Sequence, residues 1–600
     1  MMTMNLPSVW GGAAAAPPGQ GPAGGCSGHL FAYSGLSGTT TEQDPLVGIG
    51  LTTSDGLALL FCSLEHAPTL HIQGGANLTS LVRVATGDVL IAGGGISDHQ
   101  LKLAWTSKDL LAGVAPLAFN VRLDYPTQAQ ATGVGCTRII GGDSTKTVTL
   151  CVNRTRTDGR LGFGLAYEWS SSYAERRATA AAAMSISELD AIVRKHLAPY
   201  SALPATKEYG PLLAKALAVM RVNSLTPEGK IKRRWSTPDR LPHKWMWLWD
   251  SCYHSLAANH LNATLGWEYV AAVLDSAAPD GAIAIERTPT TSGGDVDQTQ
   301  PPLLAWAVVE NAKAARRAGV SNETVNERLS YALPRLAAYL RWDAAHRADP
   351  TGATALLRWT RGTESGMDNS PRFGGWPAQS NASELLAVDF SVFYAREAAL
   401  LSTIAAELGD ESEAAYWRAV STNTSRAVHD RLFDANSGLY FDFNVARGKL
   451  SRVIASTALL PLWLDDLPKE RLPRMLAALR DPSLFGTPVP LPSVARSMPS
   501  FSTDMWRGPM WVNSNYMTAL ALQARGAAAE ADRLLHATLR PMQDAYMEHG
   551  VIFEFYDADG KADPRTLMRK GAPTGGVRDY HWSAALAFDM IMRLTKSAQM

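Results

Sequence analysis

The pattern of hydrophobic and polar positions changes character near residue 172 of the chain. Before that point, short strand-like runs are separated by Gly, Asp, Asn and Pro turns at near-regular spacing. The runs are 46–53, 57–63, 69–73, 80–91, 101–105, 117–123, 137–141, 147–152 and 161–169. Such spacing is typical of antiparallel strands, so we predict an antiparallel β-sandwich domain over residues 27–171. Because it lacks an aromatic cluster for a sugar, we interpret it as a packing or lid domain rather than a lectin-like module.

Beyond that point the periodicity is helical. Residues 172–206 predict a helical linker, and residues 207–600 predict a helical catalytic domain. The twelve candidate helices are 207–223, 250–262, 264–277, 301–318, 321–347, 383–408, 410–432, 453–463, 467–479, 509–525, 526–548 and 582–597. Helices joined by alternately short and long connections can close into a barrel of hairpins whose loops form one ring. The long connections are 224–249, 278–300, 348–382, 480–508 and 549–581, and they hold the unusual residues.

Composition restricts the classes of partner. The chain has 600 residues, 46% of them hydrophobic, which is enough for two domains. Lys plus Arg and Asp plus Glu number 56 each, so no charge surplus favours nucleic acid or an anionic membrane surface. No apolar run is long enough to predict a membrane span. We therefore expect a neutral small molecule as partner, and the composition leaves the oligomeric state open.

Signals for the cellular compartment point in opposite directions. Five cysteines without a CxxC pattern predict neither a zinc site nor a disulfide scaffold, although Cys136 and Cys151 flank a predicted hairpin and can pair in an oxidising compartment. Glycosylation-type triplets favour a secretory or lysosomal setting. They begin at Asn77, Asn153, Asn262, Asn322, Asn381 and Asn423. Residues 1–26, rich in Ala, Gly and Pro, predict a disordered lead-in with no recognisable secretory signal.

The loop at 362–373 is the centre of the functional hypothesis. It combines turn-forming residues with Glu364, Asp368 and Arg372. In isolation an Asp-Asn-Ser-Pro string is better read as a solvated turn. Four further segments, each in a long connection, favour the functional reading.

The first two of these segments combine aromatic and polar residues. Trp245, Trp247 and Trp249 alternate, which would place indoles on one side of an extended strand, either as a sugar platform or as a buried plug. Asp250 beside them favours binding of a hydroxyl pair or an arginine. Gln300 precedes two prolines at the mouth of a predicted helix, where its amide can meet hydroxyls or cap the helix.

The other two segments add a guanidinium and a second carboxylate. Arg507 can pair with a loop carboxylate, while Trp506 and Trp511 flank the predicted cavity. Glu554 lies between two phenylalanines, which favours a functional carboxylate in an aromatic pocket. The Asp557 to Gly560 run is only faintly similar to a calcium loop and is interpreted as a turn.

Taken in order, these segments resemble the motif series of glycoside hydrolase family 63, most closely its mannosylglycerate hydrolase branch, with trehalases as more distant relatives. The segments are Trp247-Leu248-Trp249-Asp250, Thr299-Gln300-Pro301-Pro302, Glu364 to Arg372, Trp506-Arg507-Gly508-Pro509 and Glu554-Phe555-Tyr556-Asp557. The resemblance covers 207–600. It implies an (α/α)6 barrel and an inverting α-glycosidase in which Asp368 is the general acid and Glu554 the general base. The candidate substrate-binding residues are Trp247, Trp249, Asp250, Gln300, Gly366, Arg372, Trp506, Arg507, Trp511, Tyr556, His581 and Trp582.

An inverting mechanism suits two carboxylates on separate loops. One carboxyl protonates the leaving oxygen and the other activates water, at a separation of about 6.5–9.5 Å, and no metal or cofactor is required. The hypothesis is hydrolysis of an α-glucosidic or α-mannosidic bond in a small glycoside such as mannosylglycerate or glucosylglycerate, or in an oligosaccharide. Arg372 and Arg507 are candidates for a substrate carboxylate, with a structural salt bridge as the alternative.

The alternatives are a catalytically silent carbohydrate-binding protein on the same barrel, a trehalase-like activity, or a phosphorylase or lyase. A pure binder gains nothing from two opposed carboxylates, and a phosphorylase needs an anion pocket in place of Glu554.

Overall fold

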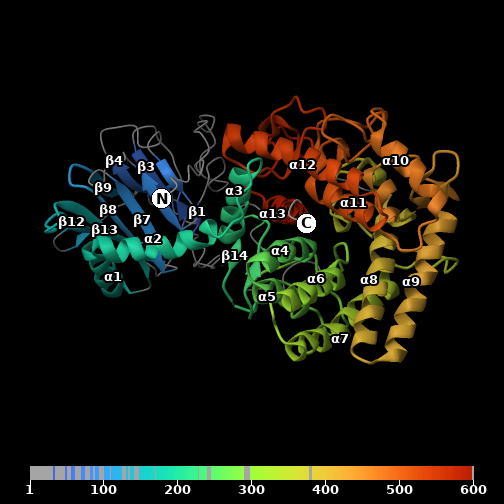
Figure 1. Ribbon diagram of the computed structural model, residues 1–600, viewed down its shortest axis with the longest axis horizontal. Helices are drawn as coiled ribbons and strands as arrows, with labels where there is room; N and C mark the ends of the chain where they lie inside the picture. Colours follow the sequence, from blue (N-terminus) through green and yellow to red (C-terminus); the bar gives the residue numbers. More distant parts are fainter. Residues whose placement is uncertain are drawn as a thin grey trace. The chain divides into compact units, whose positions relative to one another are not determined.

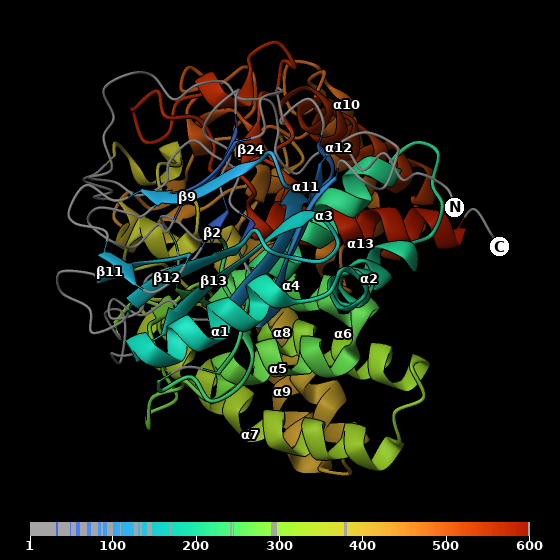
Figure 2. The ribbon, with the colours of Figure 1, turned by 90° about the vertical axis from the view of Figure 1, so that its left-hand side faces the viewer.

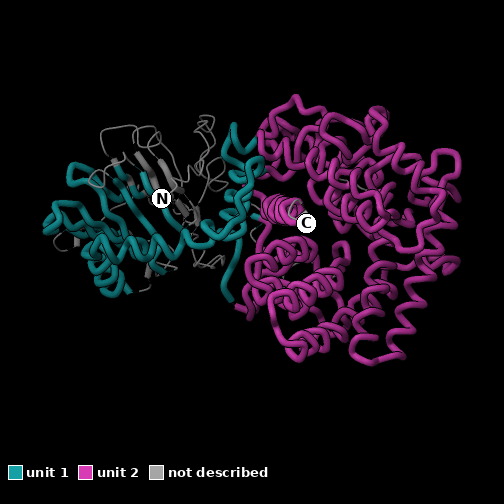
Figure 3. The backbone as a smooth tube through the Cα atoms, viewed as in Figure 1, with its two compact units in different colours: residues 1–228, 239–244, 545–552 teal, residues 229–238, 245–544, 553–600 magenta. Residues whose placement is uncertain are grey.

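The computed structural model divides the described part of the chain into two compact units, shown in Figure 3. Unit 1 contains residues 1–228, 239–244 and 545–552, and unit 2 contains 229–238, 245–544 and 553–600. The described residues are 32–33, 48–49, 56–60, 69–73, 82–85, 88–92, 100–107, 110–124, 130–132, 135–140, 147–168, 170–227, 229–239, 243, 245–289, 297–376 and 381–597. The predicted lead-in at 1–26 lies outside them.

Unit 1 is built around antiparallel sheets. Eight strands pair in the order β10-β11-β12-β13-β8-β7-β6-β5, and three more in the order β3-β4-β9. Their bounds are β3 Gly56–Leu60, β4 Thr69–Gln73, β5 Val82–Ala85, β6 Val89–Ala92, β7 Leu101–Ser107, β8 Leu110–Pro116, β9 Asn120–Asp124, β10 Gln130–Thr132, β11 Cys136–Ile140, β12 Thr147–Asn153 and β13 Arg160–Glu168. A further pair joins β1 Ala32–Tyr33 to β2 Gly48–Ile49. The predicted β-rich N-terminal region is confirmed.

Two helices cover part of the large sheet. The α1 helix, Ser171–Ala183, packs across β8, β12 and β13, and α2, Ile186–Ser201, packs on β6 to β8 (Figure 2). Gly164 on β13 permits the close approach, because a Cβ there would lie 2.1 Å from the Ala178 carbonyl oxygen of α1. Apolar side chains of β6, β7 and β8 form one buried cluster with Leu189 and Val193 of α2.

The predicted pairing of two cysteines is confirmed. Cys136 on β11 and Cys151 on β12 occupy directly opposed positions of the ladder and form a disulfide. Their neighbours in the packing include Ala174 and Ala178 of α1. The disulfide therefore fixes the strand pair beneath α1.

Unit 2 is mostly helical, and its helices correspond to the predicted ones. Helices α8 and α9 run side by side as one hairpin (Figure 1). The bounds are α4 Leu248–Leu261, α5 Ala263–Leu274, α6 Leu304–Arg317, α7 Asn322–Arg347, α8 Val388–Glu407, α9 Glu411–Arg431, α10 Leu472–Arg480, α11 Val512–Ala524, α12 Ala528–His549 and α13 His581–Ser597. The last residues of α12 belong to unit 1, as does the helix α3, Gly210–Val222. None of the described helices is long and apolar enough to cross a membrane.

One predicted helix has a different form. The segment Ser456–Trp463 is a 3-10 helix with Pro461 inside it, and a short 3-10 turn, Lys469–Arg471, precedes α10. Proline has no N–H, but α2, α7 and α12 each contain a proline and are α-helical, so Pro461 alone does not account for the 3-10 form.

Two-residue strand pairs tie the long connections of unit 2 together. Strand β16, Met246–Trp247, pairs with β17, Glu286–Arg287, and β23, Met510–Trp511, pairs with β24, Phe555–Tyr556. The first pair joins the connection before α4 to the connection after α5. The second joins the segment of Trp511 to the segment of Glu554.

Candidate active site

The loop that carries Asp368 is anchored by the fully buried carboxylate of Glu364. This carboxylate accepts hydrogen bonds from the backbone of Thr299 (3.1 Å), the backbone and hydroxyl of Thr360 (2.7 Å each) and the backbone of Arg361 (3.2 Å). Arg347 completes the set with an ion pair at 2.6 Å. Glu364 therefore holds the loop against the segment that precedes Gln300, and both of its carboxylate oxygens accept hydrogen bonds from the protein.

Arg372 is a second buried anchor of the same loop, which corrects its prediction as a substrate ligand. Its Nε and Nη2 donate to Asp442 at 2.8 and 2.9 Å, and its Nη1 and Nη2 donate to Asp389 at 2.7 and 2.9 Å. Nη1 also lies 3.8 Å from the Met367 sulfur. The two carboxylates raise the pKa of the guanidinium despite its burial. No N–H remains for a substrate, and the alternative of a structural salt bridge is what the structure contains.

Gly366 lets the loop pack directly on α4. Its φ is +71°, and a Cβ there would lie 2.1 Å from a ring carbon of Trp249. Any side chain at 366 would meet both the unfavourable backbone region and the indole. Gly366 is therefore a close-packing position between the loop and Trp249.

Asp368 projects from this loop to an ion pair with Lys570. The carboxylate Oδ2 lies 2.7 Å from the Lys570 ammonium, and both side chains are partly exposed. Lys570 has a φ of +53°, in a turn closed by pairing of Arg569 with Ala572. Its ammonium also lies 4.5 Å from the ring centroid of Trp376. This lysine was not among the residues predicted from the sequence.

Glu554 is buried and is held through one oxygen. Its Oε2 accepts from the Arg569 Nε and from the Val577 backbone, each at 3.2 Å. The Glu554 charge raises the pKa of the Arg569 guanidinium, and Asp368 contributes in the same direction. Within the described part of the chain, no donor lies on the other carboxylate oxygen. Consecutive residues of one turn, Arg569 and Lys570, thus contact the two carboxylates that the sequence analysis selected.

The predicted aromatic residues form a packed cluster rather than an open platform. Trp506 stacks on Trp511 at 3.6 Å between ring centroids, Trp511 lies 5.6 Å from Trp582, and Trp582 lies 5.1 Å from Trp249. All four are at most 3% exposed. Of the three alternating tryptophans predicted to share one strand, Trp247 lies in strand β16, whereas Trp249 lies in α4. The buried-plug alternative therefore describes most of this set, while Trp247 is half-buried.

Asp250, Gln300 and Tyr556 are buried, and each is hydrogen-bonded to another group of the protein. The Gln300 Oε1 accepts from the Trp249 backbone at 3.2 Å, so it caps the start of α4 rather than that of the helix after it. The Tyr580 hydroxyl donates to Asp250 at 3.4 Å. The Tyr556 hydroxyl accepts from the Phe553 backbone at 2.9 Å, and burial raises the pKa of Tyr556.

His581 belongs to a buried histidine pair, which differs from its predicted role as a substrate ligand. Its ring stacks on His254 at 3.6 Å between centroids, and its Nδ1 donates to the Thr237 carbonyl at 3.0 Å. The His254 Nδ1 lies 2.9 Å from the Ser236 hydroxyl. Burial lowers the pKa of His581 to about 3 and lowers that of His254, to which His581 also contributes. Both rings are therefore neutral at physiological pH.

Arg507 contacts the central loop through backbone rather than through a carboxylate. Its Nη1 donates to the Asn369 carbonyl at 3.3 Å, while the Asn369 Oδ1 accepts from the Trp506 backbone at 2.9 Å. No described carboxylate lies within ion-pair distance of Arg507, so its predicted pairing with a loop carboxylate is wrong. Among the described residues, the Asn369 carbonyl is the acceptor found for its guanidinium.

Comparisons with known proteins identify a family for more than half of the chain. Residues 243–583 match the family described as mannosylglycerate hydrolase MGH1-like glycoside hydrolase domain. A mannosylglycerate hydrolase of Rubrobacter radiotolerans is 32% identical over 196 residues, which are 32% of this chain and 40% of that relative. A mannosylglycerate hydrolase of Thermus thermophilus is 25% identical over 455 residues, 62% of this chain and 99% of that relative.

Solved structures show the same fold. The crystal structure of a glycoside hydrolase family 63 mannosylglycerate hydrolase from Thermus thermophilus, in complex with glucose, superimposes with a TM-score of 0.52 at 24% identity. It covers 64% of this chain and 100% of that chain.

Proposed function

The chain belongs to the mannosylglycerate hydrolase MGH1-like glycoside hydrolase family, and from this premise we propose that it is an inverting α-glycoside hydrolase of small glycosides. Asp368 is the proposed general acid and Glu554 the proposed general base. The observation that carries this assignment is the turn at 569–572, where Arg569 contacts Glu554 and Lys570 contacts Asp368. Two carboxylates from distant loops thereby meet one short element.

We infer that unit 2 forms an (α/α)6 barrel and that the sheets of unit 1 form a β-sandwich. The paired helices α4–α5, α6–α7 and α8–α9 support the barrel, since each pair packs together. The fold shared with the Thermus thermophilus enzyme supports the same arrangement. In such a barrel the long connections gather at one end, where Asp368 and Glu554 reside.

The surroundings of Glu554 suit a general base. Arg569 and the Val577 backbone donate to one oxygen and so orient the carboxylate, and the other oxygen is left to accept a proton from water. General bases contribute about 10²- to 10⁴-fold to turnover, so loss of Glu554 should nearly abolish it.

The surroundings of Asp368 suggest how a substrate engages it. In the structure one Asp368 oxygen contacts the Lys570 ammonium at 2.7 Å. An anion on the substrate can compete with Asp368 for this ammonium. A carboxylate on the leaving group of the substrate would do this, because it offers Lys570 an equivalent partner.

A carboxylate-bearing leaving group therefore fits this site better than a neutral sugar. Lys570 and Arg507 replace Arg372 as the residues proposed to bind that carboxylate, since every N–H of Arg372 already has a partner. Mannosylglycerate is such a substrate, and the relatives named above are mannosylglycerate hydrolases. Glucosylglycerate has the same charged leaving group.

A substrate screen tests this function. Purified wild type, Asp368→Asn and Glu554→Gln are incubated with mannosylglycerate, glucosylglycerate, trehalose, and α-linked gluco- and manno-oligosaccharides, and released sugar is measured. We expect wild type to hydrolyse the glycerate glycosides preferentially and both variants to lose that activity. Hydrolysis of trehalose alone would favour a trehalase-like enzyme, and sugar binding without hydrolysis would favour the silent binding protein.

A further inference from the structure

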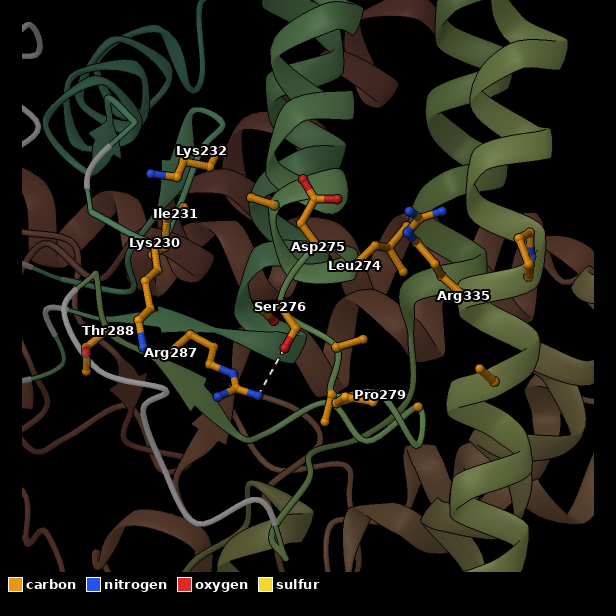
Figure 4. Close-up of a pocket in the computed structure, with 16 residues that line it drawn as sticks. Lys230, Ile231, Lys232, Leu274, Asp275, Ser276, Pro279, Arg287, Thr288 and Arg335 are labelled. Carbon is orange, nitrogen blue, oxygen red and sulfur yellow. Dashed lines mark hydrogen bonds between the residues drawn. The ribbon is translucent and has the colours of Figure 1, made fainter.

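A pocket in unit 2 has a strongly basic lining. It has a volume of about 700 Å³ and lies where the turn after α5 and the strand β17 meet α7 (Figure 4). The charged residues that line it are Lys230, Lys232, Asp275, Arg287 and Arg335. Neither Asp368 nor Glu554 lines it, so the proposed reaction leaves it unexplained.

Arg287 is a buried cation that has no counter-charge among the described residues. It is 8% exposed, and its Nη2 donates to the Ser276 carbonyl at 3.0 Å, the contact drawn in Figure 4. The Nε has no acceptor, and no described carboxylate lies within ion-pair distance of the guanidinium. Burial lowers the pKa of Arg287, which reflects the cost of holding this charge away from water. Buried charges in proteins are usually paired, so an unpaired one at a pocket wall indicates a missing partner.

The other charges of the pocket do not supply that partner. Lys230 and Lys232 are exposed at its edge, and Arg335 packs over the Tyr331 ring at 3.7 Å. Asp275 is the one carboxylate among the lining residues, and it pairs with Arg233 at 2.7 Å. The pocket therefore has a positive field around a guanidinium whose free donors match a planar or tetrahedral oxyanion.

We propose that this pocket binds a small organic anion through a phosphate or carboxylate group on Arg287, with Lys230 and Lys232 at its edge. A volume of about 700 Å³ is in the usual range for small-molecule sites and exceeds the need of a bare inorganic ion. The ligand class is thus a sugar phosphate or a polycarboxylate rather than a neutral sugar.

The strand pair β16–β17 connects this pocket to the candidate active site. Arg287 is paired with Met246, and the next pair joins Glu286 to Trp247. Because successive side chains of a strand point to opposite faces, Arg287 and Trp247 belong to opposite faces of this ladder. The α4 helix with Trp249 and Asp250 follows directly, so an anion on Arg287 would restrain the segment that leads into the site.

Titration calorimetry on the purified full chain tests the proposal. The probes are inorganic phosphate, glucose 6-phosphate, citrate and, as the uncharged comparison, glucose. The variants are Arg287→Met and the double variant Lys230→Gln, Lys232→Gln, whose positions are exposed. Arg317→Gln is the matched control, since it removes a positive charge from an exposed position outside the pocket.

We expect one-to-one binding of glucose 6-phosphate or citrate that is weakened at least tenfold in Arg287→Met, weakened less in the double lysine variant and unchanged in Arg317→Gln. The tighter of the two ligands identifies phosphate or carboxylate as the recognised group. Anion binding that is equal in wild type and all variants, or absent from wild type, would overturn the proposal.

Thermal unfolding gives an independent readout that does not require activity. Because Arg287 has no ion-pair partner to lose in the described part of the chain, Arg287→Met should unfold at the same or a higher temperature than wild type in anion-free buffer. Wild type should gain thermal stability on addition of the bound anion, and Arg287→Met should not. A large loss of stability in Arg287→Met without ligand would mean that this residue has an internal structural partner, and the anion site would be wrong.

Discussion

The ammonium of Lys570 lies 2.7 Å from the carboxylate of Asp368, so the proposed general acid is ion-paired before substrate arrives. This contact relates substrate choice to catalysis. A substrate that brings its own carboxylate can compete with Asp368 for Lys570. A neutral substrate cannot.

Replacement of Lys570 should therefore affect charged and neutral substrates differently. In Lys570→Met, we expect kcat/KM for mannosylglycerate to fall about 10- to 100-fold, which is the factor that corresponds to the loss of one charge-assisted hydrogen bond. Hydrolysis of an uncharged aryl α-mannoside should not fall, because Lys570 has no partner on it. Steady-state kinetics on both substrates measure the difference, with the exposed Lys469→Met as control. An equal loss on both substrates would contradict the role in substrate recognition.

Arg569 should act on turnover through Glu554. We expect Arg569→Met to lower kcat about tenfold or more with a smaller change in KM, because the base loses a charged donor that orients it. Arg569→Lys should recover part of kcat, since it keeps the charge without the guanidinium geometry. An unchanged kcat in Arg569→Met would show that Val577 alone positions Glu554.

Arg372 should matter for stability. Arg372→Met leaves Asp389 and Asp442 buried without their shared cation, and breaking a buried pair in this way costs about 3–5 kcal/mol. Urea unfolding followed by tryptophan fluorescence measures the loss. Arg507→Met, with no described ion pair, is the control and should be close to wild type. A loss below about 1 kcal/mol in Arg372→Met would contradict the anchoring role, since most surface ion pairs contribute no more than that.

The stacked pair of His254 and His581 predicts acid sensitivity. The pKa of His581 is about 3 in the folded chain and about 6.5 when unfolded, so the unfolded state binds more protons between these values. Stability should be unaffected above about pH 7 and fall below pH 6.5 by about 1.4 kcal/mol per pH unit for each such histidine. Urea unfolding at pH 7.5, 6.0 and 5.0 measures this slope. His581→Gln should flatten it, and an unchanged slope would contradict the assignment.

The helices of unit 2 could be predicted because their periodicity is local. The segment Ser456–Trp463 is apolar enough for a helix but forms a 3-10 helix, which the local pattern does not distinguish from an α-helix. The paired Cys136 and Cys151 could also be predicted, since a short hairpin brings them together.

The roles of individual polar residues could not be predicted, because they depend on partners far away in the sequence. Arg372 is 17 residues from Asp389 and 70 from Asp442, and nothing local distinguishes those carboxylates from others. His581 pairs with His254 for the same reason. The one local signal for Lys570 was a pair of basic residues before a glycine inside a long connection, which is also what an ordinary solvated turn contains.

The stereochemistry of hydrolysis tests the central claim most directly. Proton NMR of mannosylglycerate hydrolysis by wild type, recorded before mutarotation, identifies the anomer released first, with Asp368→Asn as the inactive comparison. The proposed roles of Asp368 and Glu554 predict initial release of the β-anomer by wild type and none by the variant. Initial release of the α-anomer would mean a retaining mechanism and would contradict the assignment of Glu554 as the base that activates water.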